Sequence, residues 1–194
     1  MRTVRVLTNE TCDHRCSFCD VRREHERASV AGYAQVRARI EAARGAAEIV
    51  LTGGEPGLRR DLPRLVAAAA KTGANVVLES NGARLAPAHA ELLARAGLGV
   101  VRLHVPGVEL HAAITGDAAG WANLVALAHA LHLVGVRVEA VVPIVAATLP
   151  ELEQIAGRIR AALPMVATIR ARVPSGPLNL KITFPDDVGL ASRL

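Results

Sequence analysis

The chain has 194 residues, of which 51% are hydrophobic and only 2% aromatic, and its formal net charge is +5 at pH 7. A chain of this length can bury one ordinary hydrophobic core. The positive charge comes almost entirely from scattered arginines, and few aromatic side chains are present to stack on bases, so the composition does not favour nucleic-acid binding. No stretch approaches the ~20 apolar residues of a membrane span, and we expect neither a signal peptide nor a membrane anchor. We therefore predict a soluble, cytoplasmic protein.

Short apolar segments alternate along the chain with segments of helical spacing. We expect strands at Thr3–Thr8, Glu48–Thr52, Asn75–Glu79, Val100–Val105, Arg137–Val142 and Met165–Val173. We expect helices at Tyr33–Arg44, Asp61–Lys71, Pro87–Ala96, Trp121–Val134 and Leu149–Leu163. Glycine stands just past several of these helices, as it commonly does where a helix ends. This alternation predicts parallel strands joined by right-handed helical crossovers.

The predicted fold class is α/β, and the strand–helix units fit either an open doubly wound sheet or an incomplete barrel. Of the two we expect a partial (β/α)6 TIM-like barrel, open on one side, over residues 1–177. Residues 178–194 would form a C-terminal tail, either an edge strand or a flap. The strands are nearly continuous apolar runs, which is typical of parallel strands buried on both faces. In both architectures the functional side chains gather at the carboxyl ends of the strands.

The only cysteines of the chain, Cys12, Cys16 and Cys19, lie within eight residues, directly after the first predicted strand. Three thiols on one loop can reach a single inorganic centre. Four would close a tetrahedral zinc site or complete a cluster, whereas three leave one coordination position open. Clustered cysteines in an odd number also argue against a disulfide framework. The loop therefore predicts a metal centre with a position free for chemistry.

Further polar or glycine-rich stretches follow the next three predicted strands. They are Gly53-Gly54-Glu55-Pro56, Ser80-Asn81-Gly82 and His104. Since the carboxyl ends of parallel strands meet at one edge of a sheet, these stretches and the cysteine loop are expected to lie together.

The spacing Cys12-x3-Cys16-x2-Cys19, with Phe18 just before the third cysteine, resembles the cluster loop of the radical S-adenosylmethionine (SAM) enzyme superfamily. The turn at 53–56 after the second strand matches the second hallmark of that family. Because both motifs stand at the expected places in the order of elements, the resemblance covers nearly the whole chain, from about Thr3 to Val173.

The resemblance implies two cofactors, a [4Fe–4S] cluster held by the three cysteines and SAM bound to the iron that they leave free. In the family, the cluster passes one electron to SAM, and the 5′-deoxyadenosyl radical that forms abstracts a hydrogen atom from the substrate. An oxygen-sensitive protein is expected. An electron donor such as reduced flavodoxin or ferredoxin is the implied protein partner.

The same resemblance assigns cofactor-binding residues. Gly53 and Gly54 would let the backbone approach the methionine end of SAM, with Glu55 receiving the ammonium group. Phe18 would lie near the adenine. Ser80 and Asn81 stand where relatives often carry Thr-Asn, and His104 stands where relatives commonly carry a serine; these three are expected to contact SAM or the substrate.

Blander interpretations of these residues stay open. The three cysteines could bind zinc with His14 as a fourth ligand. The glycine-rich stretches could be ordinary turns, and His104 could be a core or rim residue. We expect His14 and Arg15 to be solvated loop residues, and we expect the remaining candidates to be structural or surface residues: His89, His111, Asp117, His129 and His132.

The charged run Arg22–Arg27 follows the cysteine loop directly. Such runs are usually solvated faces, but this one could also rim the entrance for an anionic substrate. No residue of the chain is identified as the catalytic acid or base.

We predict an enzyme that cleaves SAM reductively at a [4Fe–4S] cluster and abstracts hydrogen from a small-molecule or peptide substrate. One alternative is a glycyl-radical-enzyme activating enzyme, because a chain of this size suits work on a protein surface as well. The other is a non-catalytic iron–sulfur or zinc protein, which would act as an electron carrier or sensor and would need no nucleoside ligand.

Overall fold

The computed structural model describes residues 2–16, 19 and 31–172. Its strands are β1 (Thr3–Leu7), β2 (Glu48–Thr52), β3 (Asn75–Ser80), β4 (Leu98–His104), β5 (Arg137–Pro143) and β6 (Val166–Arg172). Its helices are α1 (Tyr33–Ala42), α2 (Leu62–Ala70), α3 (His89–Arg95), α4 (His111–Thr115), α5 (Gly120–Leu133) and α6 (Leu152–Ala162), with short 3-10 turns η3 (Pro56–Leu58) and η4 (Leu149–Glu151).

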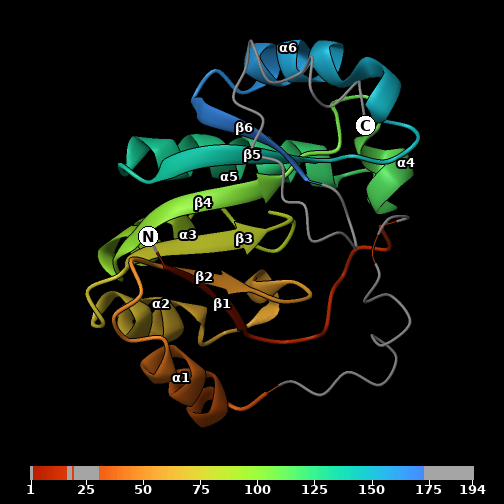
Figure 1. The fold of residues 1–194 in the computed structure, drawn as a ribbon. Coiled ribbons are helices and arrows are strands. Elements are labelled where there is room, and N and C mark those ends of the chain that lie inside the picture. Colours follow the sequence, from red (N-terminus) through yellow and green to blue (C-terminus); the bar gives the residue numbers. More distant parts are fainter. Residues whose placement is uncertain (1, 17–18, 20–30, 173–194) are drawn as a thin grey trace.

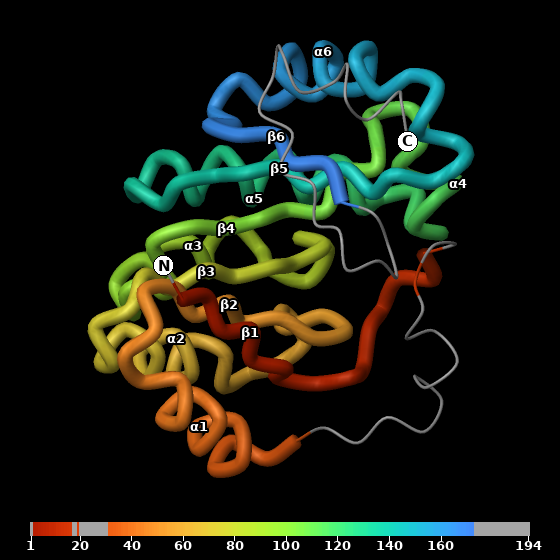
Figure 2. The backbone as a smooth tube through the Cα atoms, viewed as in Figure 1, coloured from red at the N-terminus to blue at the C-terminus, as the bar shows by residue number. Residues whose placement is uncertain are grey.

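The six strands form one parallel sheet in the order β1-β2-β3-β4-β5-β6, so each strand pairs with its neighbours in the sequence (Figure 1). A doubly wound sheet would reverse its strand order at a switch point, and this sheet does not. β1 and β6 are the two edges and do not pair with each other. The prediction of a partial barrel that is open on one side is therefore confirmed, with all strands running toward the edge that carries the cysteine loop (Figure 2).

One face of the sheet packs against the helices and forms the hydrophobic core. The side chains that alternate outward on the strands, such as Leu51, Leu78 and Leu103, are fully buried there with Leu65 and Leu127 of the helices. Leucine and branched residues on one stripe of each helix fill this layer. It is this layer that holds the strand ends, and hence the loops that follow them, in fixed positions.

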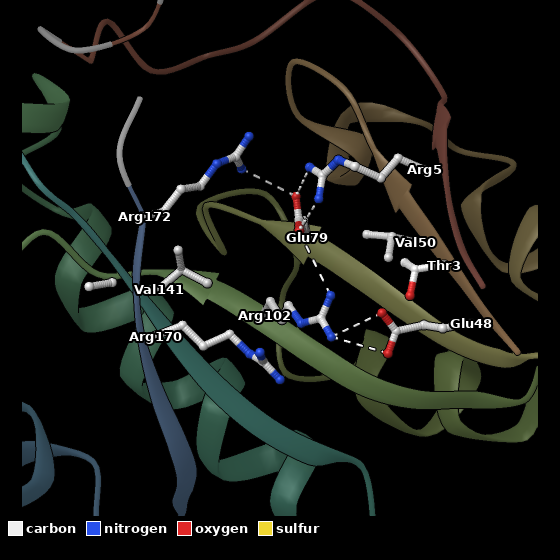
Figure 3. A pocket seen from close by; sticks show the side chains of 10 residues that line it. Thr3, Arg5, Glu48, Val50, Glu79, Arg102, Val141, Arg170 and Arg172 are labelled. Atoms are coloured by element: carbon white, nitrogen blue, oxygen red, sulfur yellow. Dashed lines mark hydrogen bonds and ion pairs between the residues drawn. The ribbon is translucent and has the colours of Figure 1, made fainter. Parts of the chain in front are cut away.

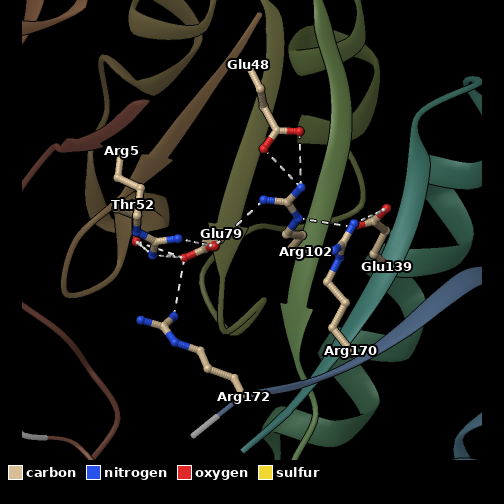
Figure 4. Close-up of polar contacts among 8 residues, drawn as sticks. All are labelled: Arg5, Glu48, Thr52, Glu79, Arg102, Glu139, Arg170 and Arg172. Atoms are coloured by element: carbon tan, nitrogen blue, oxygen red, sulfur yellow. Dashed lines mark hydrogen bonds and ion pairs between the residues drawn. The ribbon is translucent and has the colours of Figure 1, made fainter. Parts of the chain in front are cut away.

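The other face of the sheet lines the inside of the barrel and carries charged side chains. Arg5, Glu79, Arg102, Glu139 and Arg170 all point inward from their strands (Figure 4). The expectation of strands with apolar residues on both faces is therefore wrong for the inner face of the sheet. The reason is visible in segments such as VVRLHV, where period-two alternation of apolar and charged residues is embedded in an apolar run.

Most predicted elements lie where we expected them, with ends shifted by one to three residues. The exception is α4, which forms in a segment that has no helical spacing and was expected to be a loop. The expected helix at Leu149–Leu163 begins with η4 and continues as α6. The expected tail at 178–194 lies outside the described residues, so the domain boundary at 177 stays a prediction. No helix among the described residues is long and apolar enough to cross a membrane.

Candidate functional site

The turn after β2 is joined to the start of the cysteine loop by backbone hydrogen bonds. Gly54 N donates to Asn9 O at 2.9 Å, and Glu55 N donates to Thr11 O at 2.7 Å. The Asn9 side chain adds a bond of 3.0 Å from its Nδ2 to Glu55 O. Because Cys12 follows Thr11 directly, this short ladder sets where the cysteine loop leaves the sheet.

The two glycines of this turn are required by the closeness of the two loops. A Cβ added to Gly53 would lie 2.3 Å from Asn9 O, and one added to Gly54 would lie 2.1 Å from Thr11 O. Both distances are far below van der Waals contact, so any larger residue would push the cysteine loop away. We expected the glycines to make room for a ligand; the structure shows that they also make room for the cysteine loop itself.

Glu55 is buried and uses its carboxylate to hold the turn after β3. Its Oε1 accepts bonds from Gly57 N at 2.6 Å and Ser80 Oγ at 2.7 Å, and its Oε2 accepts one from Asn81 N at 2.7 Å. Burial raises the pKa of Glu55 to about 7, although these three hydrogen bonds act to lower it. Three of the protein's own donors thus hold the carboxylate in place.

Asn81 connects the same turn to the cysteine loop. Its side-chain Nδ2 lies 3.9 Å from Cys12 Sγ and donates to Asp13 Oδ1 at 2.9 Å. Amide groups directed at a cysteine sulfur are typical of the surroundings of iron–sulfur clusters, where they stabilise the thiolate. Asn81, Ser80 and Glu55, all predicted site residues, are therefore brought together with the loop that carries Cys12.

The cysteines themselves are half-buried, and none is in a disulfide. Burial raises the pKa of Cys12 to about 11, and burial with the neighbouring Cys12 and Cys19 raises that of Cys16 to about 12. These thiols would lose their protons on binding a metal centre, because its positive charge stabilises the thiolates. Such a donor set fits a cluster.

No group of three or more His, Cys, Asp and Glu side chains in the described part of the chain surrounds a single ion position. A cluster does not need that arrangement, because each thiolate binds a different iron.

His14, between the first two cysteines, is buried and not solvated as we expected. Its Nε2 lies 3.2 Å from Asp117 Oδ2, and its ring meets His111 edge-on with centroids 6.1 Å apart. The next residue donates its backbone N–H to Thr115 O at 2.9 Å. The α4 segment therefore packs against the cysteine loop, a relationship that no sequence signal predicted. The other prediction for this group holds, because Arg15 is exposed.

His104 points inward at the carboxyl end of β4. Its Nε2 is buried and has no hydrogen-bond partner among the described residues. Burial lowers the pKa of His104 to about 4, although the nearby Glu79 carboxylate acts to raise it. A neutral ring with an unpartnered nitrogen inside the barrel is consistent with a ligand contact, and the role of His104 stays a prediction. His89, His129 and His132, for which we expected surface positions, are exposed.

Sequence reasoning missed the ion-pair network on the inner face of the sheet. Arg102 contacts Glu48, Glu79 and Glu139 from the middle of the sheet, with its Nε 3.0 Å from Glu139 Oε2 (Figure 4). Arg170 joins the same Glu139 at 2.7 Å. The alternation of charged residues within the strands is the signal that could have revealed it.

Comparison with known proteins assigns the family. The chain matches the family model described as the Radical SAM superfamily over residues 6–156. The chain belongs to the radical SAM superfamily. This membership confirms the resemblance that the two motifs indicated, and with it the enzyme class and the two cofactors of the family, a [4Fe–4S] cluster and SAM.

Similar proteins within the superfamily include GTP 3′,8-cyclases. A probable GTP 3′,8-cyclase of Pyrobaculum aerophilum is 35% identical over 122 residues, which are 60% of this chain and 39% of that protein. The GTP 3′,8-cyclase of Synechococcus elongatus is 33% identical over 141 residues, 68% of this chain and 43% of that protein. This radical SAM chain therefore spans less than half the length of the curated relatives that it matches.

A similar solved structure is that of Streptococcus suis SuiB bound to SAM. It superposes with a TM-score of 0.75 at 15% sequence identity and covers 98% of this chain and 46% of that one. At this identity the likeness concerns the fold, and it agrees with a radical SAM partial barrel. Phe18 and the charged run at 22–27 lie outside the described residues, so the roles predicted for them stay predictions.

Proposed function

We propose that this chain carries the catalytic core of an enzyme that cleaves SAM reductively and takes a hydrogen atom from a small-molecule or peptide substrate. The observation that carries the proposal is the interlocking of three loops at one edge of the barrel. The cysteine loop, the Gly53–Glu55 turn and the Ser80–Asn81 turn are joined by direct hydrogen bonds. In a radical SAM chain these loops are the parts that a cluster and its ligand would need to share.

The residues have distinct roles in this proposal. Cys12, Cys16 and Cys19 hold the cluster, which when bound supplies the electron that breaks the carbon–sulfur bond of SAM. Asn81 donates toward the Cys12 sulfur. Glu55 acts as a positioning residue, because its carboxylate already accepts three hydrogen bonds from the protein.

Oε2 of Glu55 accepts only one of these bonds, so Glu55 stays a predicted acceptor for the ammonium group of SAM, together with backbone carbonyls of the glycine turn. The backbone N–H groups of this turn point toward the cysteine loop, since Gly54 N donates to Asn9 O and Glu55 N donates to Thr11 O. We keep Gly53 and Gly54 as predicted contacts of the methionine end. Ser80 donates a hydrogen bond to Glu55 and so stabilises this turn.

The partner proposed for the reaction is a low-potential electron donor such as reduced flavodoxin or ferredoxin. The curated relatives favour a second candidate for the substrate, a purine nucleotide, because they are named GTP 3′,8-cyclases. Incubation with GTP and analysis of the nucleotide products would test this candidate directly.

The decisive experiment reconstitutes the protein without oxygen and supplies SAM and dithionite. We expect about four irons and four sulfides per chain, as a [4Fe–4S] cluster requires, and formation of 5′-deoxyadenosine. An intact cluster without any 5′-deoxyadenosine would overturn the catalytic proposal and favour an electron carrier or sensor.

A pair of variants separates cluster binding from general damage. Cys16→Ala should lose both the cluster and the product, because three thiolates are needed to hold three irons. Arg158→Gln, on the exposed face of α6, should keep both. Product formation by Cys16→Ala at the wild-type rate would count against the assignment of the cysteines.

A further inference from the structure

The inside of the barrel contains a pocket of about 380 Å³ on the charged face of the sheet (Figure 3). Its walls come from all six strands, and it is open on the side where β1 and β6 do not meet. The charged residues that line it are Arg5, Glu48, Glu79, Arg102, Arg170 and Arg172. None of these residues belongs to the loops that carry the cofactor motifs.

The charges of this pocket do not balance. Among the described residues, four arginines and two glutamates line it, so two positive charges are in excess. Glu139 does not line the pocket but pairs with Arg102 and Arg170, and counting its charge reduces the excess to one positive charge. His104, at the end of β4, adds no charge at physiological pH, because burial lowers its pKa to about 4.

Glu79 and Glu139 stay ionised at neutral pH, because their pKa values are lowered. Burial acts to raise the pKa of Glu79, but the hydrogen bonds and charge of Arg5, together with Arg172, lower it to about 2. The pKa of Glu139 is also lowered, because the bonds from Arg170 and Arg102 outweigh its burial. An excess of cations in a half-enclosed pocket is costly unless anions enter it.

The excess is concentrated between the two edge strands. Arg5 of β1 and Arg172 of β6 both approach the same oxygen, Glu79 Oε2, from opposite sides (Figure 3). Arg5 binds the carboxylate with both terminal nitrogens, whereas Arg172 stands 3.5 Å away, outside good hydrogen-bond distance. Both arginine side chains are 39% exposed, and both line the pocket although they share one carboxylate.

We propose that this pocket binds an anionic group of the substrate, a phosphate or a carboxylate, between Arg172 and Arg5, with Arg170 beside them. The inference rests on the proposed function, since it places the substrate of that reaction. Planar guanidinium groups bind such anions through paired hydrogen bonds, and here two of them face each other across the barrel opening. A bound anion would supply the negative charge that Glu79 alone does not.

The position of the anion sets the orientation of the rest of the substrate. Arg172 pairs in register with Pro143, the last residue of β5, and so lies at the carboxyl edge of the sheet. Arg170 pairs with Val141, which in turn pairs with His104 of β4. A substrate anchored here would therefore extend past His104 toward the edge that carries the cysteine loop.

The test measures the binding of two probe anions, pyrophosphate and tricarballylate, to the anaerobically reconstituted protein by titration calorimetry. We expect one of them to bind, and to bind about tenfold more weakly to Arg172→Gln, as the loss of one charged hydrogen-bond donor implies. Arg172→Lys should bind the anion more weakly than the wild type and more tightly than Arg172→Gln. Arg158→Gln, a surface arginine of α6 with comparable exposure, should bind as the wild type does.

Each outcome decides the matter. Pyrophosphate binding that depends on Arg172 indicates a phosphorylated substrate, and tricarballylate binding of the same kind indicates a polycarboxylate. No binding of either anion, or equal binding by Arg172→Gln and Arg158→Gln, overturns the inference. Formation of 5′-deoxyadenosine by the same wild-type preparation is scored separately, so that loss of SAM cleavage with intact anion binding would refute only the proposed function.

Discussion

Ser80 Oγ donates a 2.7 Å hydrogen bond to Glu55 Oε1, although 25 residues separate the two in the sequence. The bond joins the turns that follow β2 and β3, directly beneath the loop that begins at Cys12. The same hydroxyl accepts a bond from Gly82 N at 3.0 Å. The small, buried side chain of Ser80 therefore connects the Gly53–Glu55 turn to the turn that holds Asn81 near the cysteine loop.

Replacing Ser80 with alanine should weaken this connection. Ser80→Ala leaves the buried Gly82 N without an acceptor, which costs about 1–2 kcal/mol of unfolding free energy. We expect SAM affinity to fall as well, because Asn81 and Glu55 lose their common support. Urea unfolding and equilibrium binding of SAM measure the two effects. Ser80→Thr retains the hydroxyl and should lose less of both; an equal loss in the two variants would show that volume, not the hydrogen bond, matters.

Replacing Gly54 with alanine should displace the cysteine loop. The new Cβ would meet Thr11 O at 2.1 Å, and the backbone on either side must move to relieve it. We expect Gly54→Ala to be soluble but to retain little iron after anaerobic reconstitution. Gly157→Ala is the matched control, since nothing lies within 4 Å of a Cβ at that position of α6. Full iron content in Gly54→Ala would contradict the close packing of the two loops.

Asp117 should matter for the cysteine loop and for α5 together. Its Oδ1 accepts bonds from Ala119 N and Gly120 N at 3.0 Å, and its Oδ2 faces His14. Asp117→Ala should cost about 1–2 kcal/mol, as loss of a helix cap does, and should speed the release of cluster iron to a chelator. Asp117→Asn can make the same contacts and should restore most of both properties. Iron release unchanged in Asp117→Ala would separate α4 from the cysteine loop.

Glu79 should make stability depend on acid. Its pKa is lowered to about 2 in the folded chain from its ordinary value of 4.5, so its contribution to stability is complete above pH 4.5 and is lost as the pH falls toward 2. That shift corresponds to about 3 kcal/mol. Glu79→Gln should therefore flatten the decline of unfolding free energy between pH 5 and 2. Glu41 forms an exposed ion pair with Arg44 and serves as the control. Glu41→Gln should leave the decline of unfolding free energy nearly unchanged.

The sequence alone determined the architecture and the identity of the cofactor loops. Apolar strands, helix-ending glycines and the spacing of Cys12, Cys16 and Cys19 are local signals, and local signals survive without knowledge of the fold. The order of the motifs was enough to place them at one edge, because parallel strands all end on the same side. The α-helix α4, which has no periodic pattern, escaped this reasoning.

The tertiary structure alone decided which side chains meet. No spacing in the sequence indicates that Arg5 and Arg172, at opposite ends of the sheet, approach the same carboxylate of Glu79, or that His14 is buried against Asp117. Alternation along a strand tells which residues share a face, but the distance across that face depends on how far the sheet curves. Curvature is a property of the whole sheet, because it depends on the twist, tilt and register of all the strands together, and so it could be seen only once the chain was folded.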